Sequence, residues 1–289
     1  MNSLIKTLLA SVSVCAVAVS SAHSQLVFQD NFDTSLDSGV ETNINFEIND
    51  GRQSGGTTSS TYYEQDSTGA GAFLNVNPNF SGGNLLLRTN YNSTGSRASG
   101  ALLNTNFGSA LVGQQYEVRF TGRIDRAPDA STDVWMSFFM FDTAFPNVDS
   151  GNPLAIVTNF GALLRQDGRA TVRADGTNHQ LVAGTTGISN GANFDFLLAV
   201  DETLTTPQAT LTIGSTVVGT WDLSFDTTDR FFGMRAHQGI AGDGVAAALT
   251  DFRYDNLSVT VIPEPGTYAA LFGLVALGAV ALRRRSRVS

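Results

Sequence analysis

The sequence contains only one cysteine, Cys15. It lies in an apolar stretch near the amino terminus, so everything from residue 25 onward lacks cysteine. Disulfides and thiolate metal sites are therefore excluded as sources of stability for the rest of the chain. Its stability must come from core burial, with a hard cation held by oxygen ligands as an additional option.

Positive charge is scarce as well. The chain has one lysine, and four of its arginines lie among the last seven residues. The remaining 12 arginines stand against 26 aspartates and glutamates, which gives residues 25–264 a formal charge of about −14. Nucleic acids and anionic membrane surfaces need a basic footprint, so neither is expected as a partner. The carboxylates could instead serve as ligands for Ca²⁺.

The amino terminus has the order of a secretory signal. A lysine precedes an apolar run at residues 8–19, and small residues follow it. This order is typical of a secretory signal peptide, and a dozen apolar residues are too few for the roughly 20 that a bilayer span needs. Ala22 and Ser24 favour cleavage before Gln25, with a cut after Ala22 as the alternative. We therefore expect the secretion machinery to export the chain and residues 1–24 to be removed.

The carboxy terminus carries a second apolar stretch. Residues 268–282 are uncharged and end at the cluster Arg283, Arg284 and Arg285. At 1.5 Å per residue, a helix of this length would cover about 22 Å, less than the roughly 30 Å of the hydrocarbon core. The stretch is apolar on all sides, which favours a short transmembrane helix over a core helix. Basic flanks stay in the cytoplasm, so the rest of the chain is expected outside it.

Pro263, Glu264 and Pro265 stand just before this stretch. Two prolines remove backbone donors and restrict their neighbours, which predicts an exposed, extended hinge. Tripeptide, short apolar helix and terminal arginine cluster together resemble the PEP-CTERM sorting signal of Gram-negative bacteria.

This resemblance assigns roles to residues 263–289 only. It implies that an exosortase, a membrane-embedded cysteine transpeptidase-like enzyme, recognises the tripeptide and cuts near it. It implies a membrane helix that is present before processing and an arginine cluster that acts as the cytoplasmic stop. The expected location is the cell envelope, outer surface or extracellular matrix of a Gram-negative bacterium.

Residues 25–262 read as one β-rich domain. Turn residues recur at short intervals, and no stretch of a dozen residues shows helical periodicity. Alternation at 116–120 predicts one buried face, whereas 134–141 is apolar on both faces and is expected to be a central strand. Two stacked antiparallel sheets follow from this pattern. The predicted strands are 85–87, 116–120, 134–141, 154–157, 171–173, 194–200, 209–213, 231–234 and 257–261.

Three segments of this domain carry a second resemblance. The opening residues 27–33, the strand at 231–235 and the closing residues 252–259 are similar to concanavalin A-like or laminin-G-like jelly rolls. The resemblance implies an all-β, two-sheet antiparallel jelly-roll sandwich in which the first and last strands pair. Another sandwich topology is the alternative.

Glycoside hydrolysis on such a fold needs paired carboxylates. Retaining enzymes place them about 5 to 5.5 Å apart, and laminarinase-type families do so with a Glu-x-Asp-x-(x)-Glu strand, which this sequence lacks. The nearest acidic pairs, Asp201 with Glu202 and Asp226 with Asp229, are expected to be solvated residues at strand ends or turns.

Nucleophilic and zinc chemistry have equally little support. The sequence has no Gly-x-Ser-x-Gly elbow. His179 and His237, without a nearby cysteine, do not make a zinc site. His237 follows a predicted strand, where it could face a groove, although a loop residue without a catalytic role is expected. We therefore predict that the protein is not an enzyme.

Calcium is the more plausible ligand. Asp30, Asn31 and Asp33 near the first strand would approach Asp255 and Asn256 on the last strand if the termini pair. Ca²⁺ takes six to eight such oxygen ligands. Alternatively, these side chains cap turns and bond to nearby backbone amides.

Glycan binding needs an exposed aromatic ring beside polar side chains. Trp135 lies in the most apolar strand, and both it and Trp221 are expected in the core. Tyr62 and Tyr63 are the better surface candidates, but neighbours on a strand point to opposite faces, so at most one could serve a given surface.

The sequence therefore predicts a non-catalytic, exported β-sandwich of the envelope, matrix or biofilm, with weak binding to extracellular polysaccharide as an option. A divergent polysaccharide-cleaving enzyme, either a hydrolase or a lyase, is the first alternative. A purely structural surface-layer component is the second.

Overall fold

The computed structural model describes residues 24–32, 62–66, 70–75, 84–90, 97–103, 105–126, 134–143, 159–181, 184–238 and 249–263. Strands make up almost all of the elements in this part of the chain. They are, with one short helix, β1 (Gln25–Asp30), β2 (Tyr62–Asp66), β3 (Ala70–Asn75), β4 (Asn84–Asn90), β5 (Arg97–Leu103), α3 (Gly108–Leu111), β6 (Gln115–Arg126), β7 (Val134–Phe141), β8 (Phe160–Leu164), β9 (Ala170–Ala174), β10 (Thr177–Leu181), β11 (Asn193–Asp201), β12 (Gln208–Ile213), β13 (Thr216–Asp222), β14 (Phe231–Gln238) and β15 (Leu249–Ile262).

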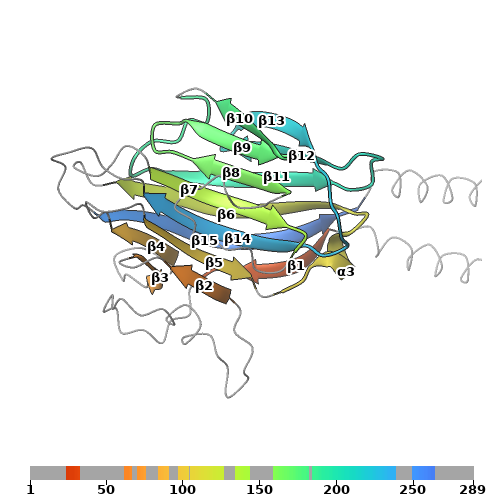
Figure 1. Cartoon of the computed structure of the whole chain (residues 1–289), viewed down its shortest axis with the longest axis horizontal. Helices are drawn as coiled ribbons and strands as arrows, with labels where there is room; N and C mark the ends of the chain where they lie inside the picture. Colours follow the sequence, from red (N-terminus) through yellow and green to blue (C-terminus); the bar gives the residue numbers. More distant parts are fainter. Residues whose placement is uncertain are drawn as a thin grey trace, which may run out of the picture.

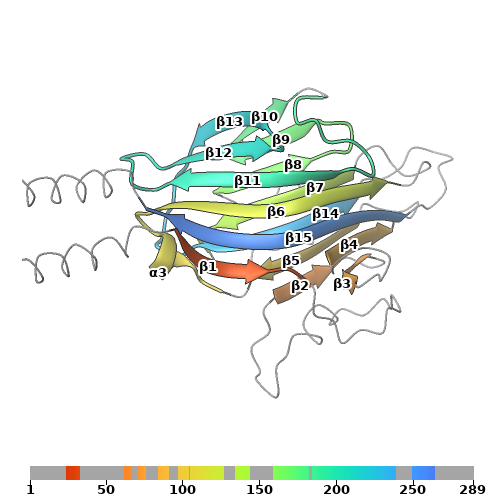
Figure 2. The same ribbon diagram turned by 180° about the vertical axis from the view of Figure 1, so that it is seen from behind.

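The strands form two antiparallel sheets. The eight-stranded sheet has the order β13-β12-β11-β6-β15-β4-β3, and β1 pairs with β15 as well. The seven-stranded sheet has the order β10-β9-β8-β7-β14-β5-β2. Figures 1 and 2 show the two layers from opposite sides. The predicted two-sheet antiparallel sandwich is confirmed.

The main core lies between the two sheets. Burial alternates along β6, so Tyr116, Val118 and Phe120 point inward while their neighbours are more exposed. Phe120 stacks on Phe196 of the same sheet, with ring centroids 4.3 Å apart, and lies 5.7 Å from Phe138 of the opposite sheet. Such contacts bury aromatic surface from both layers at once, which makes hydrophobic burial the main source of stability.

Tyr254 ties the layers together with a buried polar group. Its hydroxyl lies 2.9 Å from the carbonyl oxygens of both Ser137 and Arg235, and it accepts the N–H of Ser137 at 3.2 Å. Tyr254 belongs to β15 of one sheet, while its partners belong to β7 and β14 of the other. Burial raises the pKa of this hydroxyl well above its ordinary value.

Strand β7 is buried on both faces, as predicted. One set of its side chains enters the main core, and the other set meets a second apolar cluster on the outer face of the seven-stranded sheet. The members of the second cluster are Leu102, Phe139, Phe141, Leu163 and Phe231, with half-buried Trp135 packed against them.

The first and last strands pair, as predicted. Gln25 on β1 pairs with Val261 on β15, and the register continues to Asp30 opposite Leu257, with an irregularity between Leu26 and Phe28. The two ends of the domain therefore lie side by side at one end of the sandwich (Figure 2).

Every strand predicted within the described residues exists, and several unpredicted strands accompany them. β5, β8 and β13 contain glycine and small residues, which weaken the alternation signal. The predicted strand at 154–157, residues 1–23 of the predicted signal and the apolar stretch at 268–282 lie outside the described residues. Within the described ranges, no helix is long and apolar enough to cross a membrane. The proposed domain boundaries remain predictions.

Candidate functional site

The outer face of the seven-stranded sheet carries a group of polar and aromatic side chains. Val134, Met136, Phe138 and Met140 of β7 fill the main core, so the alternate residues Trp135 and Ser137 lie on the outer face. On β14 the same alternation sends Phe232, Met234 and Ala236 inward. It places Arg235 and His237 on the outer face.

Strand register brings these residues together. Arg235 is opposite Ser137, and His237 is opposite Trp135. Arg165 follows β8, and its guanidinium carbon lies 4.2 Å from the centroid of the Trp135 ring. We call Trp135, Ser137, Arg165, Arg235 and His237 the aromatic-basic face.

The exposure of these side chains differs. Trp135 is half-buried, and Arg165 is 8% exposed. Arg235 and His237 are 0% and 2% exposed, so they lie beneath the surface. Within the described part of the chain, Ser137 Oγ is buried and makes no hydrogen bond. A buried polar atom of this kind points to an unseen water or ligand, or to strain.

A contact between a cation and an aromatic ring fixes the Trp135 side chain. Such a contact contributes about 0.5 to 2 kcal/mol, with the higher values at desolvated sites. The backbones of Ser137 and Arg235 are held from the core side by Tyr254. The face is therefore supported by rigid strands and by a hydrogen bond from the opposite sheet.

The eight-stranded sheet has an outer face of a different kind, on which charges are matched within the chain. Arg123 Nε lies 2.7 Å from Asp125 Oδ1, and Arg253 Nε lies 3.0 Å from Asp125 Oδ2. Arg253 also contacts Asp251 at 3.2 Å. Partly exposed pairs of this kind contribute little to stability, and they give this face the character of a solvated surface.

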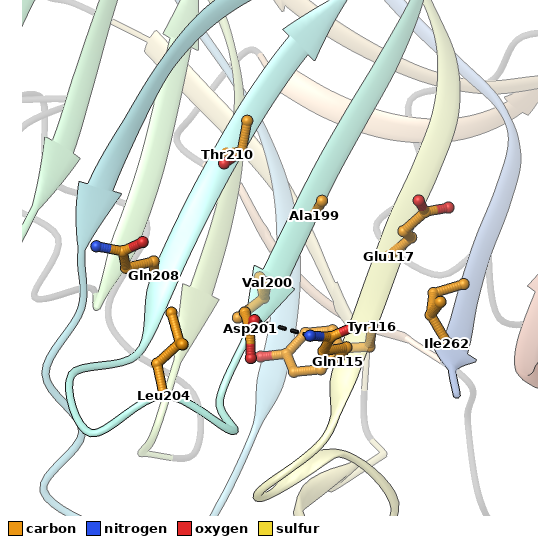
Figure 3. Close-up of a pocket in the computed structure, with 10 residues that line it drawn as sticks. All are labelled: Gln115, Tyr116, Glu117, Ala199, Val200, Asp201, Leu204, Gln208, Thr210 and Ile262. Carbon is orange, nitrogen blue, oxygen red and sulfur yellow. Dashed lines mark hydrogen bonds between the residues drawn. The ribbon is translucent and has the colours of Figure 1, made fainter. Parts of the chain in front are cut away.

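A pocket of about 310 Å³ lies on this second face, at the end of the sheet where β15 terminates (Figure 3). Gln115 Nε2 donates to Asp201 Oδ2 at 2.8 Å across it. Burial by itself would raise the pKa of Asp201, but hydrogen bonds from Thr203, Gln115 and the Leu204 backbone outweigh it and lower that pKa. The lining residues are Gln115, Tyr116, Glu117, Ala199, Val200, Asp201, Leu204, Gln208, Thr210 and Ile262.

Glu202 was expected to be solvated, and that expectation is wrong. Glu202 and Arg230 form a bidentate ion pair with both side chains 3% exposed, the Nε–Oε1 and Nη2–Oε2 distances each being 2.7 Å. Tyr116 donates its hydroxyl to Glu202 at 2.8 Å, and Arg230 lies 3.5 Å above the Phe225 ring. Burial, followed by the Glu202 charge, raises the pKa of Tyr116. Asp226 is exposed, as expected.

The proposed calcium ligands make local hydrogen bonds. Asp30 accepts the Phe32 N–H at 2.8 Å, Asn31 accepts from Gln29 at 2.8 Å, and Asp255 accepts the Asn256 N–H at 2.7 Å. The contacts of Asp30 and Asp255 with backbone amides are of the kind named above as the alternative. Asp33 lies outside the described residues, and the described part holds no cluster of three or more His, Cys, Asp or Glu that could bind a metal. Calcium binding remains a prediction.

The structure differs from the prediction in where one of the candidate aromatic residues lies. Trp135 lies outside the main core, contrary to expectation, whereas half-buried Trp221 packs against that core. Tyr62 pairs with Leu103 and Tyr63 with Leu102. Leu103 belongs to the main core and Leu102 to the second cluster.

A role of either tyrosine in glycan binding remains a prediction. Sequence reasoning did not single out Ser137, Arg165 or Arg235. Arg235 and His237 stand two positions apart just after the strand predicted at 231–234, and this spacing was the available signal for part of this face.

The sorting residues stand at the edge of the described chain. Pro263 follows β15 directly, while Glu264, Pro265, Arg283, Arg284 and Arg285 lie outside the described residues. The family model of the PEP-CTERM protein-sorting motif matches residues 261–285. The predicted sorting signal is thereby confirmed, and it implies an exported protein that is processed by an exosortase and sorted to the cell envelope.

Solved structures with low sequence identity are similar to the chain. An endo-1,3-β-glucanase from Streptomyces sioyaensis is 14% identical with a TM-score of 0.52, and the alignment covers 83% of this chain and 97% of that one. The winged bean acidic lectin is 15% identical with a TM-score of 0.48, covering 83% and 99%. An endo-β-1,4-glucuronan lyase from Trichoderma reesei is 11% identical with a TM-score of 0.46, covering 81% and 94%.

No curated protein matches the sequence. The glucanase likeness is one of fold alone, and the body is a two-sheet antiparallel jelly roll, as predicted.

Proposed function

We propose that the body of this protein is a non-catalytic glycan-binding component of the envelope or extracellular matrix of a Gram-negative bacterium. Its binding surface is the aromatic-basic face. The observation that carries this proposal is the Trp135 ring with the Arg165 guanidinium 4.2 Å from its centroid, on a sheet face outside the main core.

The chemistry of the face suits a polysaccharide. Sugar rings present C–H groups that pack on an aromatic surface and hydroxyls that need donors and acceptors. Trp135 supplies the surface, and Arg165 supplies fixed N–H donors. Half-buried Arg173 lies on the same face, because its neighbours Val172 and Ala174 enter the main core. We place the ligand on these three side chains, with Ser137 and Arg235 supporting them from below.

A retention experiment tests this proposal. The full-length protein, solubilised in mild detergent, is passed over immobilised polysaccharides that include β-1,3-glucan, a polyuronate and the extracellular polysaccharide of its host. Trp135→Ala is expected to weaken retention about tenfold, which corresponds to the ~1.4 kcal/mol of one aromatic contact.

Trp221→Phe is the matched control, because it removes an indole from the opposite sheet. Retention that Trp135→Ala leaves unchanged, in a protein with an unchanged melting temperature, would refute the proposed surface. Failure of every polysaccharide to retain the protein would favour the purely structural surface-layer role.

Polysaccharide cleavage is the second candidate, and one arrangement favours it. Arg235 and His237 lie on the same face of β14, with His237 opposite Trp135. An imidazole can act as a general base near neutral pH, and a guanidinium can neutralise a carboxylate. Together they suit β-elimination from a uronate that reaches them from the Trp135 side: the base removes the proton beside the carboxylate, the glycosidic C–O bond at the next carbon breaks, and the departing oxygen takes a proton from water.

The two candidates differ in their products. Cleavage by elimination yields unsaturated uronate ends with ultraviolet absorbance, and hydrolysis yields new reducing ends. Either product, lost in a His237→Ala variant that still folds, would reject the non-catalytic proposal. Retention without any product supports it.

A further inference from the structure

The sorting motif begins inside the folded sheet. The matched stretch starts at Val261, whereas β15 continues to Ile262. Val261 pairs with Tyr116 on β6 and with Gln25 on β1, and Ile262 pairs with Gln115. The first two residues of the motif are therefore held by strand pairing, on both sides in the case of Val261.

No linker separates the body from the tripeptide. Pro263 follows Ile262 directly and cannot extend the strand ladder because it lacks an N–H. Pro265 is three residues beyond Ile262, and each residue spans at most ~3.6 Å, so the tripeptide ends within about 11 Å of the sheet. An enzyme that binds the tripeptide must therefore come within about 11 Å of the end of the sandwich.

Three exposed apolar side chains lie at the end of the sandwich where the chain leaves β15. Leu26, Val112 and Leu204 are 54%, 38% and 43% exposed. Leu26 is opposite Thr260 on β15. Val112 lies three residues before Gln115, and Leu204 lies three residues after Asp201. Gln115 and Asp201 are paired across β6 and β11. Figure 3 shows Leu204 and Ile262 beside the pocket. We call Leu26, Val112, Leu204 and Ile262 the exit surface.

The exposed large hydrophobic side chains of the described residues are concentrated at this end of the sandwich. The described residues expose four large hydrophobic side chains, and three of them belong to the exit surface. The fourth, Val217, is 66% exposed and pairs with Thr212 near the hairpin between β12 and β13. That hairpin lies at the end of β12 away from Gln208, which lines the pocket.

The charge at the exit surface favours a protein over a lipid partner. Glu117 and Asp201 line the adjoining pocket, together with the amides of Gln115 and Gln208. Carboxylates are repelled by anionic headgroups. An apolar centre bordered by polar groups is the usual composition of a protein interface.

We propose that the exit surface is a second recognition site for the exosortase. While the active site of the enzyme holds the tripeptide, its extracytoplasmic surface contacts Leu26, Val112 and Leu204, with donor or cationic groups beside Glu117 and Asp201. The enzyme then recognises a folded body next to the motif and not the motif alone.

A processing assay tests this site in the full-length chain, expressed in a host that carries the exosortase. The double variant Leu26→Asp with Leu204→Asp is expected to slow conversion to the cut form about tenfold, as loss of ~1.4 kcal/mol of interface contact would. Val217→Asp is the control and is expected to be processed at the normal rate. Equal rates for the double variant and the unaltered protein would overturn the proposal.

A second variant separates recognition from folding or export. A six-residue Gly-Ser insertion between Ile262 and Pro263 moves the tripeptide up to about 20 Å farther from the sheet. In this background the exit surface is no longer held beside the enzyme that binds the tripeptide, so the insertion itself should slow processing and the double substitution is expected to have no further effect. A further slowing of the same size would mean that the substitution acts elsewhere, and would overturn the proposal.

Photo-crosslinking identifies the occupant directly. A photoreactive residue at position 204 of the full-length chain is expected to crosslink to the exosortase, and one at position 217 is not. Crosslinks from position 204 to lipid alone would replace the proposed site by a membrane contact.

Discussion

The ion pair between Glu202 and Arg230 allows a sharp test of what stabilises the sandwich. Glu202 follows β11, and Arg230 precedes β14 of the other sheet. Glu202→Gln keeps the shape of the side chain and an oxygen that can accept from Tyr116. It removes the negative charge opposite Arg230 and places an N–H₂ group where a carboxylate oxygen lay 2.7 Å from Nη2.

The expected cost is large because the remaining charge stays buried. Breaking one partner of a buried pair costs about 3 to 5 kcal/mol. For a domain of this size, ~1 kcal/mol shifts the melting temperature by about 2 to 4 °C, so a decrease of roughly 6 to 20 °C is expected. Urea unfolding of the full-length protein in detergent measures the free energy, with an unchanged slope as the sign that the folded state is otherwise intact.

Two comparisons make the test decisive. Glu117→Gln breaks a pair with Arg119 whose side chains are 24% and 55% exposed, and it should cost no more than about 1 kcal/mol. The double variant Glu202→Leu with Arg230→Met removes both charges, so it should cost less than Glu202→Gln alone. A Glu202→Gln cost equal to that of Glu117→Gln would refute the assignment of a desolvated pair.

Four further outcomes are expected. Tyr254→Phe should cost about 1 to 3 kcal/mol in urea unfolding, because buried backbone groups of Ser137 and Arg235 lose a partner. Since burial raises the pKa of Tyr254, its contribution is complete below the unfolded value near 10 and is lost as pH rises further, so stability should fall between about pH 10 and 11, and less steeply in Tyr254→Phe. EDTA should lower the melting temperature if Asp30, Asn31, Asp33 and Asp255 hold calcium, and an unchanged transition would exclude a stabilising ion. Gly108→Ala should destabilise the protein by about 1 to 3 kcal/mol in the same assay, since its Cβ would overlap the Thr228 carbonyl oxygen, and an unchanged free energy of unfolding would contradict this close approach.

The candidate site was only partly accessible from the sequence. Alternation in β14 puts Arg235 and His237 on one face, which periodicity alone can predict. Whether that face is the core or the outside depends on which sheet covers it. Trp135 was assigned to the core for this reason, because a strand that is apolar on both faces does not reveal which side the second sheet occupies.

The sequence also did not show which strands and loops lie next to one another. Arg165 reaches Trp135 because β8 lies beside β7, and Glu202 reaches Arg230 across 28 positions of sequence. An acidic residue at a strand end is usually solvated, and no local pattern distinguishes it from one that an arginine from another loop will cover.

The sequence by itself determined the sorting signal and the class of fold, because both depend on local order. The sorting signal is defined by the order of a proline-bounded tripeptide, an apolar stretch and an arginine cluster along the chain. Alternating hydrophobicity with frequent turns predicts strands even when the partners of those strands are unknown. The tertiary structure alone decided that the sorting motif starts within a paired central strand, next to Gln25 at the start of β1. That arrangement depends on the register between strands more than 200 residues apart, which hydrogen bonds and packing of the complete sandwich select.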